Sequence, residues 1–289
     1  MDYSGKELIV IAGPTAVGKT AYAIELARKY HTEILSADSR QFYRELKIGT
    51  AAPTEEELAA APHHFIGNLS IHDYYNVSIY EQEAMTLLEQ LFRKHDKVIA
   101  VGGSGLYIDA LCYGIDELPD ADEALRVEIK RRFAGEGIAY LQREVERLDP
   151  DFYQVVDRNN PKRLQRALEV CLATGKPYSS LRTNRRKKRP FAIKKYVLNM
   201  GREKLYERIN RRVDKMMEAG LLDEVRSLLP YKELNALNTV GYKELFRYFE
   251  GEISLEQAVT DIKTNSRRYA KRQITWFKRY RDFEWVAVE

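Results

Sequence analysis

The sequence has no long hydrophobic run and only two cysteines. No segment approaches the roughly 18 consecutive apolar residues that cross a membrane. The N-terminal stretch MDYSGKELIV also lacks the basic and then apolar pattern of a secretory signal. We therefore expect a cytoplasmic protein with no membrane partner. Cys112 and Cys171 lie among apolar residues without the spacing of metal ligands, which favours buried thiols in a reducing compartment.

An excess of one charge is missing as well, because the formal net charge of the 289 residues is only +4. That balance alone identifies no class of partner. The basic residues are nevertheless concentrated in two segments. Residues 182–189 carry six Lys or Arg in eight positions, and eight more lie between Asp261 and Asp282 with no acidic residue among them. Two such segments on a nearly neutral chain indicate a polyanionic partner.

The N-terminal region contains a phosphate-binding motif. An apolar stretch typical of a buried strand, Leu8 to Ala12, leads into GPTAVGKT, which matches the P-loop pattern G-x-x-x-x-G-K-[ST]. A helical pattern follows over residues 21–30, with Ile24 and Ala27 expected on its buried side. Strand, loop and helix in this order predict a site for a diphosphate or triphosphate, formed by Gly13, Pro14, Thr15, Ala16, Val17, Gly18, Lys19 and Thr20.

The residue types of this motif suit phosphate binding. Gly13 and Gly18 allow the backbone to turn its N–H groups toward phosphate oxygens, with the positive end of a helix behind them. Lys19 adds a full positive charge, and the Thr20 hydroxyl can hold Mg²⁺. A chance match to the pattern is the alternative, but a strand before it and a helix after it are the context that the function requires.

A carboxylate ends the second predicted strand, in the stretch 32–38. In an open parallel sheet this end of a strand faces the ligand crevice. Asp38 is therefore predicted to be a Mg²⁺ ligand or a general base, with an ordinary aspartate that caps a turn as the alternative. Ser39, Arg40 and Gln41 follow it and offer donors and acceptors for a base edge or a phosphate.

The expected elements describe an α/β fold, a P-loop NTPase-like parallel sheet core with an all-helical insertion domain. The first part of the core covers residues 1–117, with a loop and short helix over 48–69, a helix over 78–95, a strand over 97–101 and a helix over 106–112. The insertion covers residues 118–189 and has only helical patterns. The second part covers 190–289, with a strand over 191–199 and helices over 202–219, 221–229, 242–249 and 255–281.

Two weaker patterns accompany this core. Gly102 to Gly105, with Ser104 as the polar member, predicts either a second loop that approaches a ligand closely or tight packing of a strand against a helix. Arg208 and Arg212 lie one helical turn apart. They can clamp a phosphate or form a solvated basic face.

In the basic C-terminal segment, aromatic residues alternate with cations. Tyr269, Trp276 and Tyr280 recur at helical spacing, which suits bases of single-stranded RNA stacked on the rings. The alternative places these rings in a core and the cations in water. We favour the RNA interpretation because the predicted insertion has a basic turn of its own at residues 162–166.

A P-loop beside a carboxylate is most often part of a kinase or NTPase. This sequence departs from that class because Asp38 is the only carboxylate expected at a strand end, and no separate Walker B strand is apparent. A small-molecule kinase also has little use for two basic segments. A diphosphate leaving group, with transfer to a nucleic-acid nucleophile, fits these features better.

Eight motifs, in order, resemble the bacterial tRNA dimethylallyltransferase (tRNA isopentenyltransferase) family. They are GPTAVGKT, SADSRQFY, IGTAAP, VGGSGLY, NNPKRLQRALEV, RINRRVDKM, NTVGYKE and AKRQITWF, and they extend over nearly the whole chain. The resemblance implies transfer of the dimethylallyl group of dimethylallyl diphosphate to the exocyclic amine of the adenosine 3′-adjacent to the anticodon. The base would be flipped into a channel, and the P-loop would hold diphosphate and not ATP.

The resemblance also implies roles for single residues. Asp38, Thr15 and Arg212 would be catalytic, with Asp38 taking the proton of the amine. Mg²⁺ would be the cofactor, held by Thr20 or Asp38. The residues expected to touch tRNA are Asp38, Ser39, Arg40, Gln41, Ser104, Arg126, Lys162, Arg163, Leu164, Gln165, Arg166, Asn238, Thr239, Val240, Gly241, Tyr242, Lys243, Lys271, Arg272, Gln273, Trp276 and Lys278.

By the same resemblance, the helical insertion would grip the anticodon stem-loop and the enzyme would act as a monomer. No zinc is expected, because the C-terminal zinc-finger cysteines of eukaryotic relatives are absent. Three alternatives remain at this point: a prenyltransferase acting on free adenine nucleotides, a P-loop small-molecule kinase that uses ATP, and a noncatalytic RNA-binding protein. The basic segments argue against the first two, and the intact P-loop argues against the third.

Overall fold

The computed structural model describes residues 2–116, 118–183 and 185–289. The chain forms two compact units, one made of Met1–Tyr113 and Lys188–Glu289 and the other of Gly114–Lys187. The predicted insertion covers 118–189, and its expected boundary falls on Glu117, which lies outside the described residues. None of the helices in the described ranges is long and apolar enough to span a membrane.

The first unit is built on a parallel sheet. Its described residues form six strands in the order β3-β2-β4-β1-β5-β6, and all neighbouring pairs are parallel. The strands are β1 (Glu7–Ala12), β2 (Ile34–Ser36), β3 (His63–His64), β4 (Lys97–Val101), β5 (Ala192–Asn199) and β6 (Glu284–Ala287). The predicted α/β class is confirmed, with β1 paired on both sides, so that it delivers the P-loop to the middle of the sheet edge.

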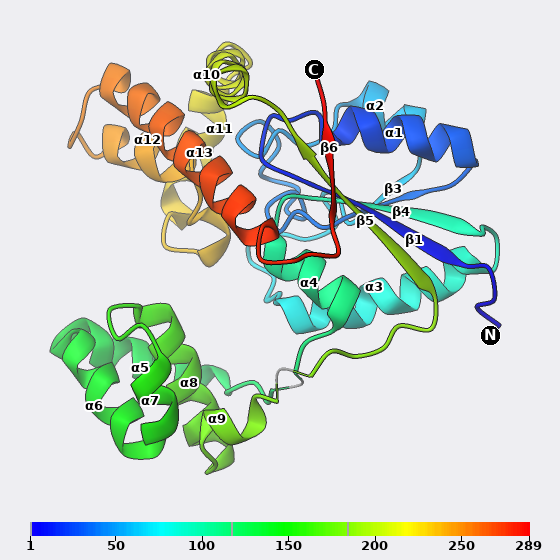
Figure 1. Ribbon diagram of the computed structural model, residues 1–289. Helices are drawn as coiled ribbons and strands as arrows, with labels where there is room; N and C mark the ends of the chain where they lie inside the picture. The colour runs from blue at the N-terminus through cyan, green and yellow to red at the C-terminus, as the bar shows by residue number, and fades with distance from the viewer. Residues whose placement is uncertain (1, 117, 184) are drawn as a thin grey trace. The chain divides into compact units, whose positions relative to one another are not determined.

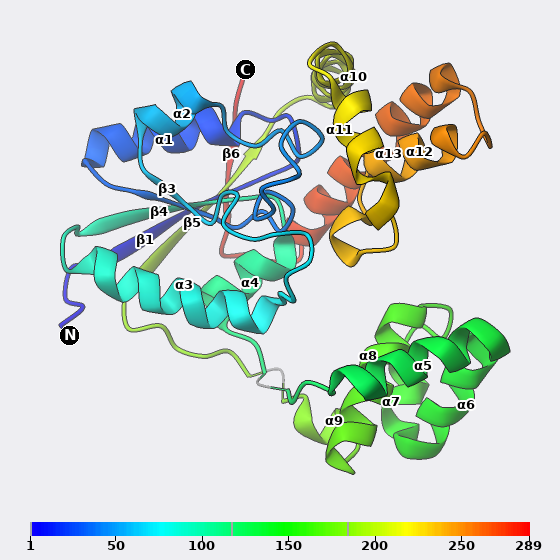
Figure 2. The ribbon, with the colours of Figure 1, turned by 180° about the vertical axis from the view of Figure 1, so that it is seen from behind.

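Helices cover both faces of this sheet. α1 (Lys19–Tyr30) and α2 (Glu55–Ala60) lie on one side, and α3 (Val77–Phe92) and α4 (Gly105–Tyr113) lie on the other (Figures 1 and 2). Successive strand residues point to opposite faces. Leu8 and Val10 of β1 accordingly pack in the core with α3 and α4, whereas Ile9 and Ile11 pack in the core with α1.

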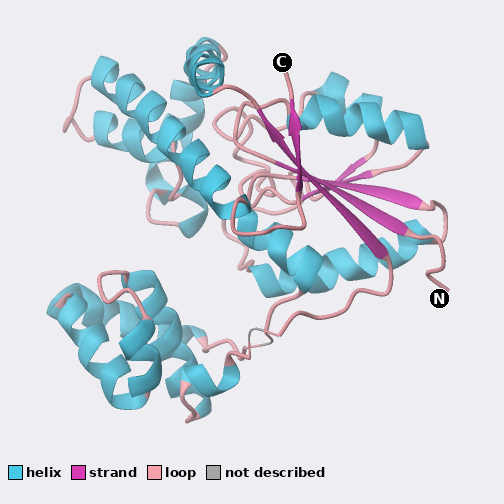
Figure 3. Cartoon of the chain, in the orientation of Figure 1, coloured by secondary structure: helices cyan, strands magenta, loops and turns pink. Residues whose placement is uncertain are grey.

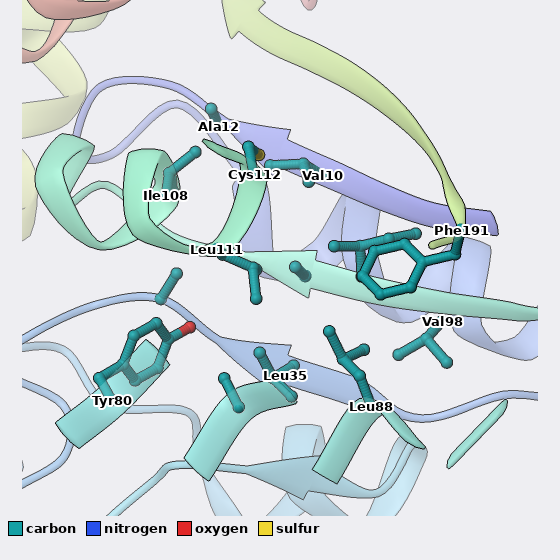
Figure 4. Packing of buried hydrophobic residues seen from close by; sticks show 14 of the residues in the cluster. Val10, Ala12, Leu35, Tyr80, Leu88, Val98, Ile108, Leu111, Cys112 and Phe191 are labelled. Carbon is teal, nitrogen blue, oxygen red and sulfur yellow. The ribbon is translucent and has the colours of Figure 1, made fainter. Parts of the chain in front are cut away.

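Figure 4 shows the core between the sheet and the helices α3 and α4. Val10, Leu35 and Val98 of the strands belong to one buried cluster with Leu88 of α3 and Leu111 of α4. All five side chains are fully buried, and each contributes roughly 1.5–3 kcal/mol relative to an exposed position. This packing holds the strand ends, and the loops that leave them, in fixed places.

A helical layer gathers beyond the carboxyl ends of the strands (Figure 3). It contains α10 (Arg202–Glu218), α11 (Leu221–Leu228), α12 (Tyr242–Phe249) and α13 (Leu255–Phe277), with the short 3₁₀ helices η1 (Leu229–Tyr231) and η2 (Asn235–Leu237). Val225, Leu245 and Ile262 of this layer share a core with Leu46 from the loop after β2. The layer is therefore packed onto the loops that surround the ligand crevice.

Among the described residues of the second unit, all regular elements are helices, as predicted. They are α5 (Glu123–Glu136), α6 (Ile138–Leu148), α7 (Pro150–Val155), α8 (Pro161–Thr174) and α9 (Tyr178–Leu181). Leu141, Val145 and Leu168 lie in its own core. Asp149 is buried and accepts hydrogen bonds from the backbone N–H groups of Phe152 and Ser179, at 3.0 and 2.6 Å. This unit needs no side chain of the sheet to form a core.

Several local expectations differ from the structure. The strands β3 and β6 were not predicted, because two and four residues carry too little pattern to distinguish a strand from a loop. The last long helix ends at Phe277 and not near residue 281, and α3 ends at Phe92. On α1 the fully buried residues are Ala23 and Ala27, and Ile24 is only half-buried.

Candidate functional site

A cavity of about 790 Å³ lies at the carboxyl end of the sheet, within the first unit. Its walls come from the P-loop, the segment after β2, residues 49–54, α10, residues 239–241 and α13. Open parallel sheets bind their ligands at this position, and the volume lies within the range of small-molecule sites. The cavity therefore brings together residues from seven of the eight motifs that the sequence singled out.

Two glycines allow the P-loop to fold against the sheet. Gly13 has a φ of +144° and Gly18 a φ of +104°, which side chains rarely tolerate. A Cβ on Gly13 would lie 2.7 Å from the carbonyl oxygen of Leu198 in β5. The requirement for glycine at these two positions, predicted from the motif, is confirmed.

Lys19 lies in the wall of the cavity. Its Nζ donates a hydrogen bond to the carbonyl oxygen of Pro14 at 2.8 Å. Burial lowers the pKa of Lys19 to about 8. The positive charge of Arg212 also lowers this pKa, whereas the negative charge of Asp38 acts to raise it. The hydrogen bond of Lys19 goes to a neutral carbonyl oxygen, so an anionic ligand would stabilise the charged ammonium group strongly.

Both predicted arginines of α10 reach the P-loop. Nη1 of Arg212 donates to Oγ1 of Thr15 at 3.0 Å, and Nη2 reaches the carbonyl oxygen of Thr50 at 3.5 Å. Nε of Arg208 donates to the carbonyl oxygen of Ala16 at 3.0 Å. Burial lowers the pKa of Arg212, although the charges of Asp38 and Glu57 act in the other direction. The interpretation as a solvated basic face is therefore wrong for Arg212.

Gln273 of α13 links two of the loops around the cavity. Its Oε1 accepts the backbone N–H of Thr15 at 2.8 Å, and its Nε2 donates to the carbonyl oxygen of Gly103 at 2.9 Å. The residue is only 5% exposed. One P-loop N–H group is therefore used to hold α13 and does not point to a ligand, a feature that the motif alone did not reveal.

Asp38 lies in the cavity wall, two residues beyond the end of β2. Its Oδ1 accepts the backbone N–H of Arg40 at 3.1 Å, which fixes the orientation of the carboxylate. Its charge acts on both Lys19 and Arg212. The predicted carboxylate and the predicted phosphate-binding cations therefore belong to one electrostatic site.

The glycine-rich loop after β4 packs directly beside this carboxylate segment. A Cβ on Gly102 would lie 2.3 Å from the carbonyl oxygen of Ala37, and Oγ of Ser104 accepts the N–H of Ser39 at 3.0 Å. Burial raises the pKa of Tyr269 to about 12, with the charge of Asp38 adding to it and a hydrogen bond to Ser104 opposing it. The loop thus packs tightly and also presents Ser104 near the cavity.

The side chains of Arg40 and Gln41 bind backbone carbonyl groups of neighbouring loops. Nη1 of Arg40 donates to the carbonyl oxygens of Asn235 and Ala236 at 2.9 and 3.0 Å. Nε2 of Gln41 donates to the carbonyl oxygen of Ala51 at 3.0 Å. Both side chains shape the walls of the cavity, and their expected contact with tRNA stays a prediction.

Some residues expected to touch tRNA are buried. The side chains of Leu164, Tyr242 and Gln273 have exposures of 0, 0 and 5%, and their expected contact with tRNA stays a prediction. Nε1 of Trp276 donates to Oδ2 of Asp109 at 3.1 Å, and the hydroxyl of Tyr280 donates to the same oxygen at 2.6 Å. Both rings are partly buried and pack against the core, and their expected contact with RNA stays a prediction.

Predicted tRNA residues of the second unit lie on α5 and α8. Arg126 and Arg166 both approach Oδ1 of Asp120, at 3.2 and 3.0 Å. Lys162 and Arg163 are exposed at the start of α8. The chain therefore places a group of cations on this unit, with one shared carboxylate to orient two of them.

The first basic segment is divided between the two units. Its last member, Arg189, is buried and pairs with Glu81 of α3 at 2.8 Å, and its Nε donates to the carbonyl oxygen of Leu111 at 2.9 Å. Arg189 thus anchors the chain where it returns to the sheet, and the expectation of a polyanion contact is wrong for this residue. Asn184 of the same segment lies outside the described residues.

The residues around the P-loop fit a Mg²⁺ ion only as a partner of a bound phosphate. Thr20 and Asp38 both line the cavity. Within the described ranges, however, no group of three or more His, Cys, Asp or Glu side chains could hold a metal. Mg²⁺ commonly binds one or two protein oxygens and takes its other ligands from phosphate and water, which this pair of residues suits.

Comparison with known proteins identifies relatives along the whole chain. The IPP transferase family model matches residues 41–280. The tRNA dimethylallyltransferase 1 of Bacteroides thetaiotaomicron is 55% identical over 282 residues, which are 98% of this chain and 92% of that protein. The tRNA dimethylallyltransferase of Christiangramia forsetii is 51% identical, over 98% of this chain and 93% of its own length.

Solved structures agree with the sequence relatives. The full-length tRNA isopentenylpyrophosphate transferase of Bacillus halodurans superposes with a TM-score of 0.70 at 36% identity, covering 98% of this chain and 90% of that one. A eukaryotic dimethylallyltransferase acting on tRNA gives a TM-score of 0.78 at 27% identity, covering 98% of this chain and 74% of that one. The chain belongs to the IPP transferase family.

Proposed function

We propose that the protein transfers the dimethylallyl group from dimethylallyl diphosphate to the exocyclic amine of the adenosine 3′-adjacent to the anticodon in tRNA. The observation that carries this proposal is one cavity lined by Asp38, Lys19 of the P-loop and Arg212 of α10, in which the charge of Asp38 acts on both cations. The family relatives carry matching names. In the reaction the allylic C–O bond breaks, an N–C bond forms, and the amine loses a proton.

The diphosphate would bind at the P-loop. Lys19 and Arg212 both lie in the wall of the cavity, where burial lowers the pKa of each. Arg208 donates to the carbonyl oxygen of Ala16 in the same loop. Negative charge grows on the diphosphate oxygens as the C–O bond breaks, and fixed cations stabilise that charge most when water is excluded. Thr15 accepts a hydrogen bond from Arg212 and would therefore bind the diphosphate together with these cations.

Asp38 would take the proton of the amine. The carboxylate is held by the N–H of Arg40 and lies on the cavity wall with the P-loop. A general base that is positioned in this way contributes about 10²–10⁴ to a rate. Thr20, with Asp38 nearby, would hold a Mg²⁺ ion that neutralises the diphosphate when both are bound.

The acceptor is proposed to be a tRNA anticodon stem-loop. Exposed cations on α8 of the second unit, Lys162 and Arg163, and on α13 and its C-terminal end in the first unit, Lys271 and Lys278, supply charge for its phosphates. A cytoplasmic location and a monomeric enzyme complete the proposal.

The test is a transfer assay with purified protein, Mg²⁺ and labelled dimethylallyl diphosphate. One reaction contains an unmodified anticodon stem-loop with adenosine 3′ of the anticodon, and a second contains AMP. A third replaces the prenyl donor with ATP. We expect label in the stem-loop and none in AMP. Label in AMP alone would indicate a nucleotide prenyltransferase, and consumption of ATP without prenyl transfer would indicate a kinase.

A further inference from the structure

One carboxylate outside the P-loop and the Asp38 segment holds a wall of the cavity. Glu224 lies near the start of α11. Its Oε2 accepts the backbone N–H groups of Lys47 and Ile48, at 3.1 and 2.8 Å. Its Oε1 accepts the N–H of Gly49 at 3.0 Å and the hydroxyl of Tyr242 at 2.6 Å. Four donors from two distant parts of the chain therefore meet on one side chain.

Of the three N–H groups, that of Gly49 belongs to the segment that lines the cavity at residues 49–54, and the other two directly precede this segment. Further along this segment, the carbonyl oxygen of Thr50 accepts two hydrogen bonds, from Nη2 of Arg212 at 3.5 Å and from Nε2 of Gln41 at 3.3 Å. A shift of the segment would therefore remove an acceptor from Arg212, whose other hydrogen bond goes to Thr15 of the P-loop.

Packing against Tyr242 also restricts the position of the segment. Tyr242 is fully buried, and a Cβ on Gly49 would lie 2.5 Å from its ring. The Gly49 backbone thus rests directly on the ring whose hydroxyl donates to Glu224. Hydrogen bonds from N–H groups to a charged acceptor are stronger than those to a neutral one, so the carboxylate form of the side chain matters.

We infer that Glu224 is a positioning residue for diphosphate binding, acting through residues 47–51 on Arg212. The inference rests on the proposed function, because it takes the P-loop cavity as the donor site. Glu224 is not among the residues that line the described cavity. Its effect on a ligand passes through the Thr50 carbonyl oxygen and the guanidinium of Arg212.

The first test measures the Kd of inorganic pyrophosphate by calorimetry for the wild-type protein and the Glu224→Gln variant. The amide keeps the shape of the side chain but replaces one acceptor oxygen with a donor, which faces an N–H group that is also a donor. We expect the Kd to rise about tenfold, by roughly 1.4 kcal/mol. The control is Asp223→Asn, the neighbouring residue of α11, whose carboxylate pairs with exposed Arg226 and whose loss should leave the Kd unchanged.

The second test separates positioning from a general loss of structure. In an Arg212→Ala background, Glu224→Gln should change the Kd far less than it does in the wild-type protein, because the group through which it acts is gone. Gly49→Ala perturbs the same segment from the other side and should weaken pyrophosphate binding in a protein that retains Arg212. This variant also keeps the proposal testable if Glu224→Gln fails to fold.

The outcomes distinguish the two proposals. A wild-type protein that does not bind pyrophosphate would refute the donor site itself, and with it the proposed function. Binding by the wild-type protein with an unchanged Kd in both Glu224→Gln and Gly49→Ala would overturn only the positioning role. An effect of Glu224→Gln that is equally large with and without the Arg212→Ala substitution would overturn it as well.

Discussion

Lys19 shows how burial sets the chemistry of a single residue in this site. Its ammonium group lies in the cavity wall and donates to a neutral acceptor, the carbonyl oxygen of Pro14. Burial lowers its pKa to about 8, because the charged form loses more solvation than the neutral form. A bound diphosphate would stabilise the charged form further. Lys19 is thus prepared for an anion at neutral pH and loses that readiness at alkaline pH.

This shift predicts a pH dependence for donor capture. The kcat/KM for dimethylallyl diphosphate should fall as the pH rises through about 8, because the neutral amine of free Lys19 attracts the diphosphate less. The kcat/KM profile reports groups of the free enzyme. The matched variant is Lys19→Arg, whose guanidinium stays charged, so its profile should lack this descending limb. A limb at the same pH in both proteins would assign it to another group.

At the scale of helices, strands and loops, close contacts at glycines determine how the site is assembled. The strand ends carry the site, and the loops that follow β1, β2 and β4 approach each other closely at glycines. Gly102 leaves no room for a Cβ against the Ala37 backbone, and Gly103 leaves none against the amide of Gln273, which would lie 2.2 Å away. These glycines let the P-loop, the Asp38 segment and α13 approach one another.

Gly102→Ala should therefore destabilise the protein by at least ~1–3 kcal/mol, the usual cost of overpacking, because the contacting atoms belong to the Ala37 backbone and cannot rotate away. Urea unfolding followed by circular dichroism measures this change. Gly135→Ala is the control. Gly135 lies in α5, where an added Cβ would have no atom within 4 Å, so alanine there should be neutral or stabilise by about 0.5–1 kcal/mol. Equal effects of the two substitutions would refute the close-contact explanation.

Long, patterned elements and the P-loop could be predicted from the sequence, since a strand such as β1 or a helix such as α10 has a strong local signal. The strands β3 and β6 could not, because their pairing partners and not their few residues make them strands. Trp276 and Tyr280 illustrate the same limit. Their spacing favours an RNA surface, but the hydrogen bonds that both rings donate to Asp109 join residues far apart in the chain, so no local pattern predicts them.

In the site too, features with a local signal could be predicted and features that depend on distant residues could not. Lys19, Asp38 and Arg212 were predicted because their residue types and positions carry chemical meaning, and the cavity unites them. The bridging role of Gln273 and the hydrogen bonds of Glu224 were not predicted. Both connect residues that are far apart in the chain, so no local pattern records them.

At the scale of the whole molecule, the cavity and the exposed cations of α8 belong to two different compact units. The first unit contains the cavity, and the second has its own core and a set of exposed cations on α8. Changes in the second unit should therefore affect RNA affinity and leave diphosphate binding unchanged. The two binding events can be measured separately, which makes this division testable.

Arg163→Ala should weaken binding of the anticodon stem-loop and lower the slope of log affinity against log salt by about 1, the change expected when one phosphate contact is lost. The Kd of pyrophosphate should stay the same. Arg131→Ala is the control, because Arg131 is an exposed arginine of the same unit that pairs with Glu128 at 2.8 Å. A salt slope that is unchanged in Arg163→Ala would remove this residue from the RNA-binding surface.

The most direct test of the account is a single-turnover measurement on Asp38→Asn with saturating dimethylallyl diphosphate and stem-loop. The account predicts a rate of prenyl transfer about 10²–10⁴-fold below that of the wild-type protein, the contribution of a positioned general base. The Kd values of the stem-loop and of pyrophosphate should stay close to those of the wild-type protein. A loss of affinity as large as the loss of rate would contradict the catalytic role of Asp38, as would an unchanged rate.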